Sequence, residues 1–169
     1  MIAEDHIKTL EGRFWRSSFL GQEESLLSPP RAPQGRWHHS GQKALYLSGS
    51  PEGCRVALKV YLSPEDPPRG IYPIDVQVPR LLDLRDPDTR HAMGITLADM
   101  HVFWADLHVG GKPVPTWEIS DRLRDAGASG LLTPSRSRPD LTHLTLLRWN
   151  DGSGALAKRA GEPLAWEAG

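Results

Sequence analysis

The sequence has only one cysteine, Cys54, among its 169 residues. An intramolecular disulfide and all cysteine-cluster zinc sites are therefore excluded. Long apolar runs are also missing, so we expect no transmembrane helix. The formal net charge is only −1, whereas domains that bind nucleic-acid backbones are usually basic. These absences argue against a membrane protein and against direct nucleic-acid binding.

Several enzyme motifs are missing too: the phosphate loop, Gly-x-Gly-x-x-Gly, His-Glu-x-x-His and Gly-x-Ser-x-Gly. Among the seven histidines only His38 and His39 are adjacent, and adjacent residues on a strand point to opposite faces. We therefore expect no metal site. The first residues, Met1 to His6, are polar and acidic, unlike a secretory signal peptide, so we expect a cytoplasmic protein.

Glycine and proline are abundant, with 16 and 15 residues, or about 18% of the chain against about 12% in average proteins. This composition predicts many turns and loops. Six tryptophans exclude a disordered chain, because disordered proteins are poor in aromatic residues. The length predicts a single domain over residues 1–169, with its core at about residues 10–150.

The first half of the chain predicts a loop, two strands and a helix. Three prolines in Ser28–Gly35 exclude regular structure there. Lys43–Ser48 is typical of a short strand, and the period-two alternation of Ile71–Val78 predicts another. Ser50-Pro51-Glu52 is typical of a helix start, and we expect that helix to end near Leu62.

Two helices are predicted in the second half. Thr96 to Asp99 fits the capping-box pattern and favours a helix that runs to about His108. We expect Thr116 to cap another helix, whose apolar residues follow helical spacing. Gly127 is a typical glycine at the end of such a helix.

Strands dominate the rest of the second half. We expect them at Gly130–Thr133 and His143–Trp149, with a separate strand or turn at Leu81–Leu84. The segment from Asp151 is rich in glycine and alanine, which predicts a loosely packed C-terminal tail. Together the elements predict an α+β fold: a curved, mostly antiparallel sheet with a few short helices.

Three segments are more specific. The first is Trp15-Arg16; the second, Gly35–Ser48, contains Gly-Arg-Trp-His and Tyr-Leu-Ser; the third, Gly127–Arg136, contains two spaced glycines and then Pro-Ser. In this order they resemble the RES domain family, toxins of bacterial toxin–antitoxin pairs named after Arg, Glu and Ser positions. The resemblance covers roughly residues 10–150. Each segment alone is weak, whereas three in order are fairly specific.

The resemblance implies a fold like that of the ADP-ribosyltransferases and a chemistry that uses NAD as substrate. Arg16 and Arg36 are the matching positions for the diphosphate, because a planar guanidinium binds oxyanions in bidentate fashion. Tyr46 would stack on nicotinamide or hold its ribose, and Ser135 would bind ribose or phosphate. His38 would contact the ribose or an acceptor. The ordinary alternatives are surface arginines, a loop histidine, a core tyrosine and a turn-forming serine.

One residue departs from the family pattern. The family has a glutamate in the helix after the tyrosine strand, and Lys59 stands at that point. Lysine has donors but no acceptor, so it cannot accept the hydrogen bond from the ribose 2′-hydroxyl that the glutamate accepts. Three explanations are open: Glu52 supplies the carboxylate, the enzyme works without it, or the site has lost its activity.

The sequence hypothesis is a RES-like toxin that cleaves the nicotinamide–ribose bond of NAD. It would be an ADP-ribosyltransferase, or an NAD glycohydrolase or phosphorylase, with a protein, water or phosphate as acceptor. The resemblance also implies an Xre-like, DNA-binding antitoxin that covers the active cleft. Two alternatives stay open: a catalytically impaired NAD- or partner-binding module of the same fold, and an unrelated β-rich interaction domain without a nucleotide site.

Overall fold

A computed structural model describes residues 4–167. Its strands are β1 (Ile7–Phe19), β2 (Leu45–Ser48), β3 (Arg69–Asp83), β4 (Gly130–Pro134), β5 (Thr142–Leu146), β6 (Leu156–Arg159) and β7 (Leu164–Ala165). Its α-helices are α1 (Pro51–Leu58), α2 (Pro87–Met93), α3 (Leu97–Met100), α4 (Trp104–Val109) and α5 (Pro115–Asp125). Short 3-10 turns lie at Glu4–His6, Glu23–Ser25 and Lys59–Tyr61.

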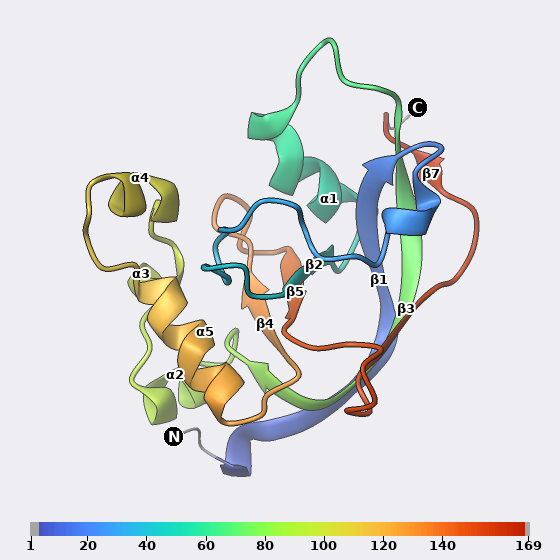
Figure 1. Ribbon diagram of the computed structural model, residues 1–169. Helices are drawn as coiled ribbons and strands as arrows, with labels where there is room; N and C mark the ends of the chain where they lie inside the picture. The colour runs from blue at the N-terminus through green and yellow to red at the C-terminus, as the bar shows by residue number, and fades with distance from the viewer. Residues whose placement is uncertain (1–3, 168–169) are drawn as a thin grey trace.

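Five strands form a closed circuit of hydrogen bonds. β1 pairs with β2, β2 with β5, β5 with β4, β4 with β3, and β3 again with β1. Figure 1 shows them as a small barrel in which β1 and β3 form a long curved pair. β3 and β4 are parallel, and the other pairs of the circuit are antiparallel. The predicted curved, mostly antiparallel sheet with a few short helices is therefore confirmed, and Leu81–Leu84 mainly continues β3.

The segment after Asp151 does not form the loosely packed tail that we expected. β6 pairs with the middle of β3 and β7 with its beginning. Ala155 and Ala157 are buried. Backbone hydrogen bonds hold this segment to the sheet, and these are available to any sequence. Its low content of large apolar side chains was therefore a misleading signal.

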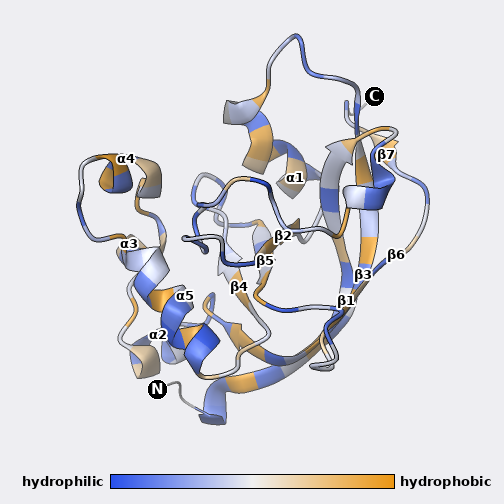
Figure 2. Cartoon of the chain, viewed as in Figure 1, coloured by the Kyte–Doolittle hydropathy of each residue, from blue (hydrophilic) through white to orange (hydrophobic). Residues whose placement is uncertain are grey.

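Alternation along the strands divides their side chains between two environments. On β2 and β5 the inward residues Leu45, Leu47, Leu144 and Leu146 are at most 2% exposed. They fill the barrel together with inward residues of the other strands, among them Phe14, Ile74, Val76, Val78 and Leu132. Figure 2 shows the corresponding alternation of hydrophobic and hydrophilic residues along β1 and β3.

A second apolar core lies outside the barrel, against α5. Ile119 and Leu123 of this helix pack in one cluster with residues such as Leu82, Leu131 and Met100, so the predicted helix is confirmed. Its start is not as predicted. Pro115 occupies the first turn and Val114 precedes it without a side-chain cap, because proline suits the first helical position. Thr116 is buried inside the helix and does not cap it.

The predicted start of α1 is confirmed, since the Ser50 hydroxyl accepts a hydrogen bond from the backbone NH of Gly53. The Thr96 capping box is also present. The single helix expected to follow it is instead divided into α3 and α4. At the break, the guanidinium of Arg36 donates to the carbonyls of Met100 and Val102, which therefore need no helical partners. No helix within residues 4–167 has the length and apolar content needed to cross a membrane.

Candidate functional site

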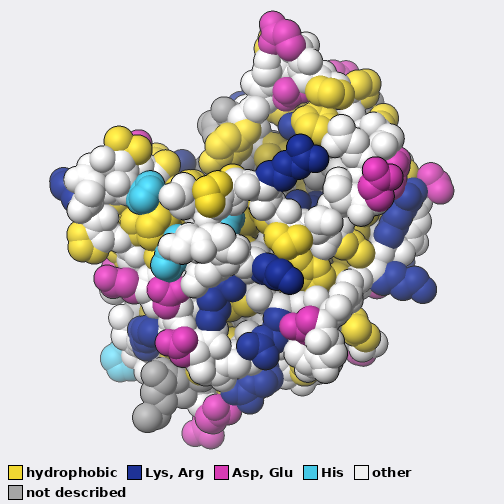
Figure 3. Space-filling view, viewed as in Figure 1, with side chains coloured by type: hydrophobic (Ala, Val, Ile, Leu, Met, Phe, Trp, Pro, Cys, Tyr) yellow, Lys and Arg dark blue, Asp and Glu magenta, His cyan; other side chains and the backbone are white. Residues whose placement is uncertain are grey.

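A cavity of about 1560 Å³ lies between the barrel, α1 and the α3–α4 region. Figure 3 shows a hollow between the lobe that carries α4 and the lobe that carries α1, with hydrophobic and basic side chains at its edges. The cavity is lined by every site residue predicted from the sequence: Arg16, Arg36, His38, Tyr46, Glu52 and Ser135. The structure thus brings together residues from distant segments; their roles stay predictions.

One wall of the cavity is a row of side chains from four neighbouring strands. Trp15 on β1 is the cross-strand partner of Ser48 on β2. Ser48 is in turn the partner of His143 on β5, and His143 is the partner of Thr133 on β4. All four residues line the cavity. They lie on the outer face of these strands, whose inner face fills the barrel. The same sheet therefore contributes side chains to the barrel core and to the cavity wall.

Tyr46 lies in the next row of this wall, opposite Thr145. Its hydroxyl accepts a hydrogen bond from the NH of Trp37 (3.0 Å) and lies 2.7 Å from Nδ1 of His38. Nε2 of His38 lies 3.0 Å from the carbonyl oxygen of Ala32. A carbonyl only accepts, so Nε2 carries the hydrogen of the neutral ring and Nδ1 accepts from Tyr46.

Both members of this pair are neutral at neutral pH. Burial raises the pKa of Tyr46 to about 12, and burial lowers the pKa of His38. The pair fixes the tyrosine hydroxyl and leaves the ring of Tyr46 in the cavity wall. In this position the aromatic ring can stack on a planar or sugar-like group of a ligand.

Gly35 makes the close approach of this pair possible. A Cβ at position 35 would lie 2.5 Å from Cε1 of His38 and 2.8 Å from the hydroxyl of Tyr46. The backbone carbonyl of Gly35 accepts a hydrogen bond from the indole of Trp117 (2.7 Å). This position thus admits only glycine without a shift of its neighbours.

Arg16 enters the cavity from β1. Its guanidinium donates to the carbonyls of Leu26 and Tyr46, both at 2.9 Å. Burial lowers its pKa, yet an arginine stays charged under all ordinary conditions. Within residues 4–167 no carboxylate pairs with it, and its hydrogen-bond acceptors are backbone carbonyls.

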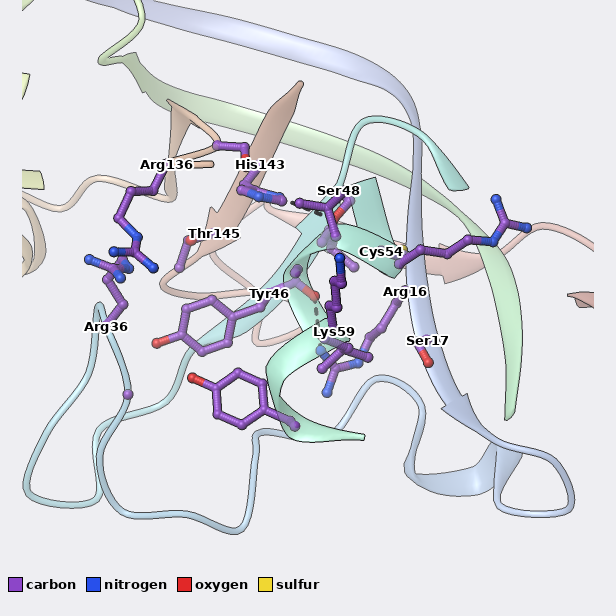
Figure 4. A pocket seen from close by; sticks show the side chains of 18 of the residues that line it. Arg16, Ser17, Arg36, Tyr46, Ser48, Cys54, Lys59, Arg136, His143 and Thr145 are labelled. Atoms are coloured by element: carbon purple, nitrogen blue, oxygen red, sulfur yellow. Dashed lines mark hydrogen bonds between the residues drawn. The ribbon is translucent and has the colours of Figure 1, made fainter. Parts of the chain in front are cut away.

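Arg36, at another part of the cavity, is likewise hydrogen-bonded to backbone carbonyls. Its Nη1 donates to the carbonyls of Met100 (2.9 Å) and Val102 (2.7 Å). Burial, and then the nearby charge of Arg136, lower its pKa. The guanidinium of Arg136 stacks 4.2 Å from the ring centre of Phe103. Figure 4 shows the ends of Arg36 and Arg136 next to each other, and in the described chain neither forms an ion pair.

Glu52 and Ser135 have structural partners as well. A carboxylate oxygen of half-exposed Glu52 lies 3.7 Å from Arg55, and the other lies 3.8 Å from Arg138. Ser135 is buried, and its hydroxyl lies 3.4 Å from the backbone NH of Arg138. The turn-forming role of Ser135 and its place in the cavity wall therefore coexist.

Lys59 follows α1 directly and is exposed, and it lines the same cavity. In Figure 4 it lies on the same side of Tyr46 as Arg16. Its ammonium group makes no hydrogen bond or ion pair with any residue that the structure describes. Lys59 thus adds positive charge to this cavity, at the position where the sequence resemblance implied an acid.

The sequence did not single out His143, Thr145 or Arg136. The hydroxyl of Ser48 lies 3.1 Å from Nδ1 of His143, and burial and the charge of Arg36 lower the pKa of that histidine. These residues meet the others only through the pairing of β2 with β5 and β4. Polar residues at His143 and Thr145, alternating with leucines, were the available signal.

The chemistry of the wall suits an anionic ligand with planar groups. Arginines supply oxyanion donors, aromatic rings supply stacking faces, and neutral His143 is able to accept a proton. Among the described residues no group of three or more His, Cys, Asp or Glu is arranged to hold a metal ion. The cavity therefore offers binding groups for phosphate and sugar.

Comparisons with known proteins bear on the family and the fold of the chain. The family model described as RES domain matches residues 13–167. The crystal structure of the M. tuberculosis MbcT-MbcA toxin-antitoxin complex contains a chain of similar fold, with a TM-score of 0.58 and 16% sequence identity. The likeness covers 91% of this chain and 86% of that one. No curated protein matches the sequence.

Proposed function

Because the chain belongs to the RES domain family, we propose that it is the toxin of a bacterial toxin–antitoxin pair and consumes NAD. The fold is also that of a chain in a toxin–antitoxin complex. The proposal includes an ADP-ribosyltransferase-like active site and an Xre-like, DNA-binding antitoxin that covers the cavity. We expect the toxin to act in the cytoplasm, on NAD or on a protein target there.

One observation carries the enzymatic part of this proposal. Arg16 and Arg36 are charged, largely buried and anchored by backbone carbonyls rather than by carboxylates. A buried charge without a counter-ion is costly, and an anionic ligand offsets that cost. The diphosphate of a dinucleotide matches the planar donor fork of arginine.

In the proposed reaction the bond between the ribose carbon and the nicotinamide nitrogen breaks. Nicotinamide leaves with both electrons of the bond, and the ribose carbon becomes cationic. An acceptor then bonds to this carbon and loses a proton. Tyr46 orients the nicotinamide ribose, Ser135 binds ribose or phosphate, and His38 fixes the hydroxyl of Tyr46. His143, neutral because burial lowers its pKa, is suited to receive the acceptor's proton.

The carboxylate of this reaction is provisionally Glu52, which lies in the first turn of α1 and lines the cavity. Its two carboxylate oxygens lie 3.7 Å from Arg55 and 3.8 Å from Arg138. Lys59 favours a second candidate function: a module that binds NAD or a partner without turnover. Its positive charge opposes the cationic transition state.

The test is release of nicotinamide from NAD by the purified chain, compared with Arg36→Ala and Lys59→Glu. Loss of one charge-assisted hydrogen bond costs about 1.5–3 kcal/mol, so Arg36→Ala should lower the rate at least about tenfold. Arg13→Ala, which removes an exposed arginine on the β1–β3 pair, is the control. Full activity in Arg36→Ala would refute the assignment of that residue.

The other outcomes separate the two candidate functions. Release only in Lys59→Glu would identify a fold that has lost its carboxylate. The binding module would be identified if the parent chain, Arg36→Ala and Lys59→Glu all release no nicotinamide while NAD raises the melting temperature of the parent chain by mass action. Incubation of cell lysate with labelled NAD distinguishes the acceptors, since a labelled protein band appears only for protein transfer.

A further inference from the structure

His101 is a titratable residue of the cavity wall to which the reaction proposed above gives no role. It follows α3 directly, at the break between α3 and α4, and it lines the cavity. Its ring atom Nε2 is buried and has no hydrogen-bond partner among the described residues. Buried polar atoms without a partner are rare in folded proteins and call for an explanation.

The backbone of His101 is fixed beside the guanidinium of Arg36. Nη1 of Arg36 donates to the carbonyls of Met100 (2.9 Å) and Val102 (2.7 Å), the residues on either side of His101. Met100 is almost fully buried, so it anchors this segment in the core. The structure thus places an imidazole and a guanidinium together in one part of the cavity wall.

A second guanidinium completes this group, the Arg36–His101–Arg136 cluster. Arg136 lines the same cavity and stacks 4.2 Å from the ring centre of Phe103, two residues after His101. Figure 4 shows the ends of Arg36 and Arg136 next to each other. No member of the cluster forms an ion pair with a carboxylate in residues 4–167. The cluster therefore consists of two fixed positive charges and one group that can become a third.

The surroundings of His101 keep its ring neutral in the free chain. Burial lowers the pKa of His101 most strongly, and the charges of both arginines of the cluster and of Arg90 on α2 also lower it. The carbonyl of Pro134, at the end of β4, acts in the opposite direction. Asp99 on α3 is engaged elsewhere, because its carboxylate accepts a hydrogen bond from the backbone NH of Thr96.

An anion bound to the two arginines of the cluster would reverse this balance. Nearby positive charges disfavour a protonated histidine ring, whereas a nearby negative charge favours it. An oxyanion between the guanidiniums offsets their charges and adds a negative charge of its own, so both effects raise the pKa of the ring. The protonated ring has two N–H donors, and hydrogen bonds from a charged donor to an oxyanion are strong.

We propose that His101 is a further ligand-binding residue, which takes up a proton when an oxyanion of the ligand's diphosphate binds between Arg36 and Arg136. The choice of a diphosphate ligand rests on the function proposed above, whereas the cluster itself does not. The proton comes from solvent, bonds to the free nitrogen of the neutral ring, and returns to solvent when the ligand leaves. Binding is therefore tighter at lower pH.

Binding calorimetry of the full chain with ADP-ribose tests this proposal. ADP-ribose carries the diphosphate of NAD but no nicotinamide bond, so no turnover interferes, and its diphosphate does not titrate near neutral pH. Titrations in two buffers with different enthalpies of ionisation give the number of protons taken up. A tenfold gain in proton affinity on binding changes the ligand affinity by up to about tenfold. From about pH 7.5 to about pH 5.5 the affinity should therefore rise about tenfold.

Two variants and one spectrum assign the proton to His101. His101→Gln should bind ADP-ribose without the proton uptake and should lose the rise in affinity at low pH. His91→Gln, which changes an exposed histidine that does not line the cavity, should retain both. An NMR titration of the assigned histidine rings in the parent chain needs no variant. The ring of His101 should titrate at a higher pH with ADP-ribose than without it.

Several results would overturn the proposal. They are binding without proton uptake, uptake of the same size in His101→Gln, and the absence of ADP-ribose binding. Release of nicotinamide from NAD tests the enzymatic function separately. A chain that releases none, yet takes up a proton at His101 with ADP-ribose, would refute that function and leave this proposal intact. A chain that releases nicotinamide, yet binds ADP-ribose without proton uptake, would refute this proposal alone.

Discussion

The two faces of β2 and β5 have opposite characters. The inward residues, Leu45, Leu47, Leu144 and Leu146, are apolar and almost fully buried. The outward residues are Tyr46, Ser48, His143 and Thr145, and they line the cavity. One pair of strands therefore supplies both buried core residues and candidate site residues. The comparison teaches that the barrel core and the candidate site are separated in this fold by single-residue alternation.

The strongest test of this separation is Leu144→Ala. Removing a fully buried leucine side chain leaves a cavity in the barrel, and such changes cost about 2–5 kcal/mol of unfolding free energy. Leu156→Ala on β6, where the leucine is 47% exposed, is the matched control. Urea unfolding followed by circular dichroism measures both. Equal losses for the two variants would contradict the assignment of the barrel interior as the main core.

A smaller effect is expected from Gly35→Ala, which extends the comparison to the cavity wall. The new methyl group would overlap His38 and Tyr46, and overpacking of this kind costs about 1–3 kcal/mol. Gly12→Ala on β1 is the control, because its Cβ would meet no atom within 4 Å. If Gly35→Ala unfolds at the same urea concentration as the parent chain, the wall is less tightly packed than the structure indicates.

The smallest expected effect is on the pH dependence of the unfolding free energy, through protonation of His143 on the outward face of β5. Burial lowers the pKa of His143, so the folded chain binds a proton there less readily than the unfolded chain. Its contribution to stability is complete above the ordinary histidine pKa of about 6.5 and is lost as the pH falls below that value. In His143→Gln the decrease of unfolding free energy between about pH 7.5 and about pH 5.5 should be smaller.

Urea unfolding at the two pH values measures this difference. His91→Gln, which changes an exposed histidine on α2, is the control and should retain the decrease of the parent chain. A decrease of the same size in His143→Gln would mean that this histidine titrates alike in the folded and unfolded chains.

Local signals predicted the local structure well. Alternation from Ile71 to Val78 identified the middle of β3, and Ser50-Pro51 identified the start of α1. Each of these signals depends on neighbouring residues in the chain. The division of the helix after Thr96 was not predictable in this way. It coincides with hydrogen bonds from Arg36, a residue more than sixty positions away.

The candidate site was predictable in part for the same reason. Arg16, Arg36 and Tyr46 lie in segments that resemble a family, so they could be named without knowing the fold. Arg136 ends the third of these segments but was not singled out. His143 lies outside all three, and only the register of β5 against β2 and β4 brings it to the cavity. The missing carboxylate at Lys59 was visible in the sequence, whereas its place beside other unpaired cations was not.

The pairing of β3 also has a consequence for biosynthesis. One edge of β3 is covered by β1, which precedes it, but the other edge waits for β4, β6 and β7. Exposed strand edges promote aggregation. Arg55 in α1 likewise donates to the carbonyls of Ala165 and Trp166. A chain still on the ribosome therefore cannot complete the wall of this cavity before residue 166 has been synthesised.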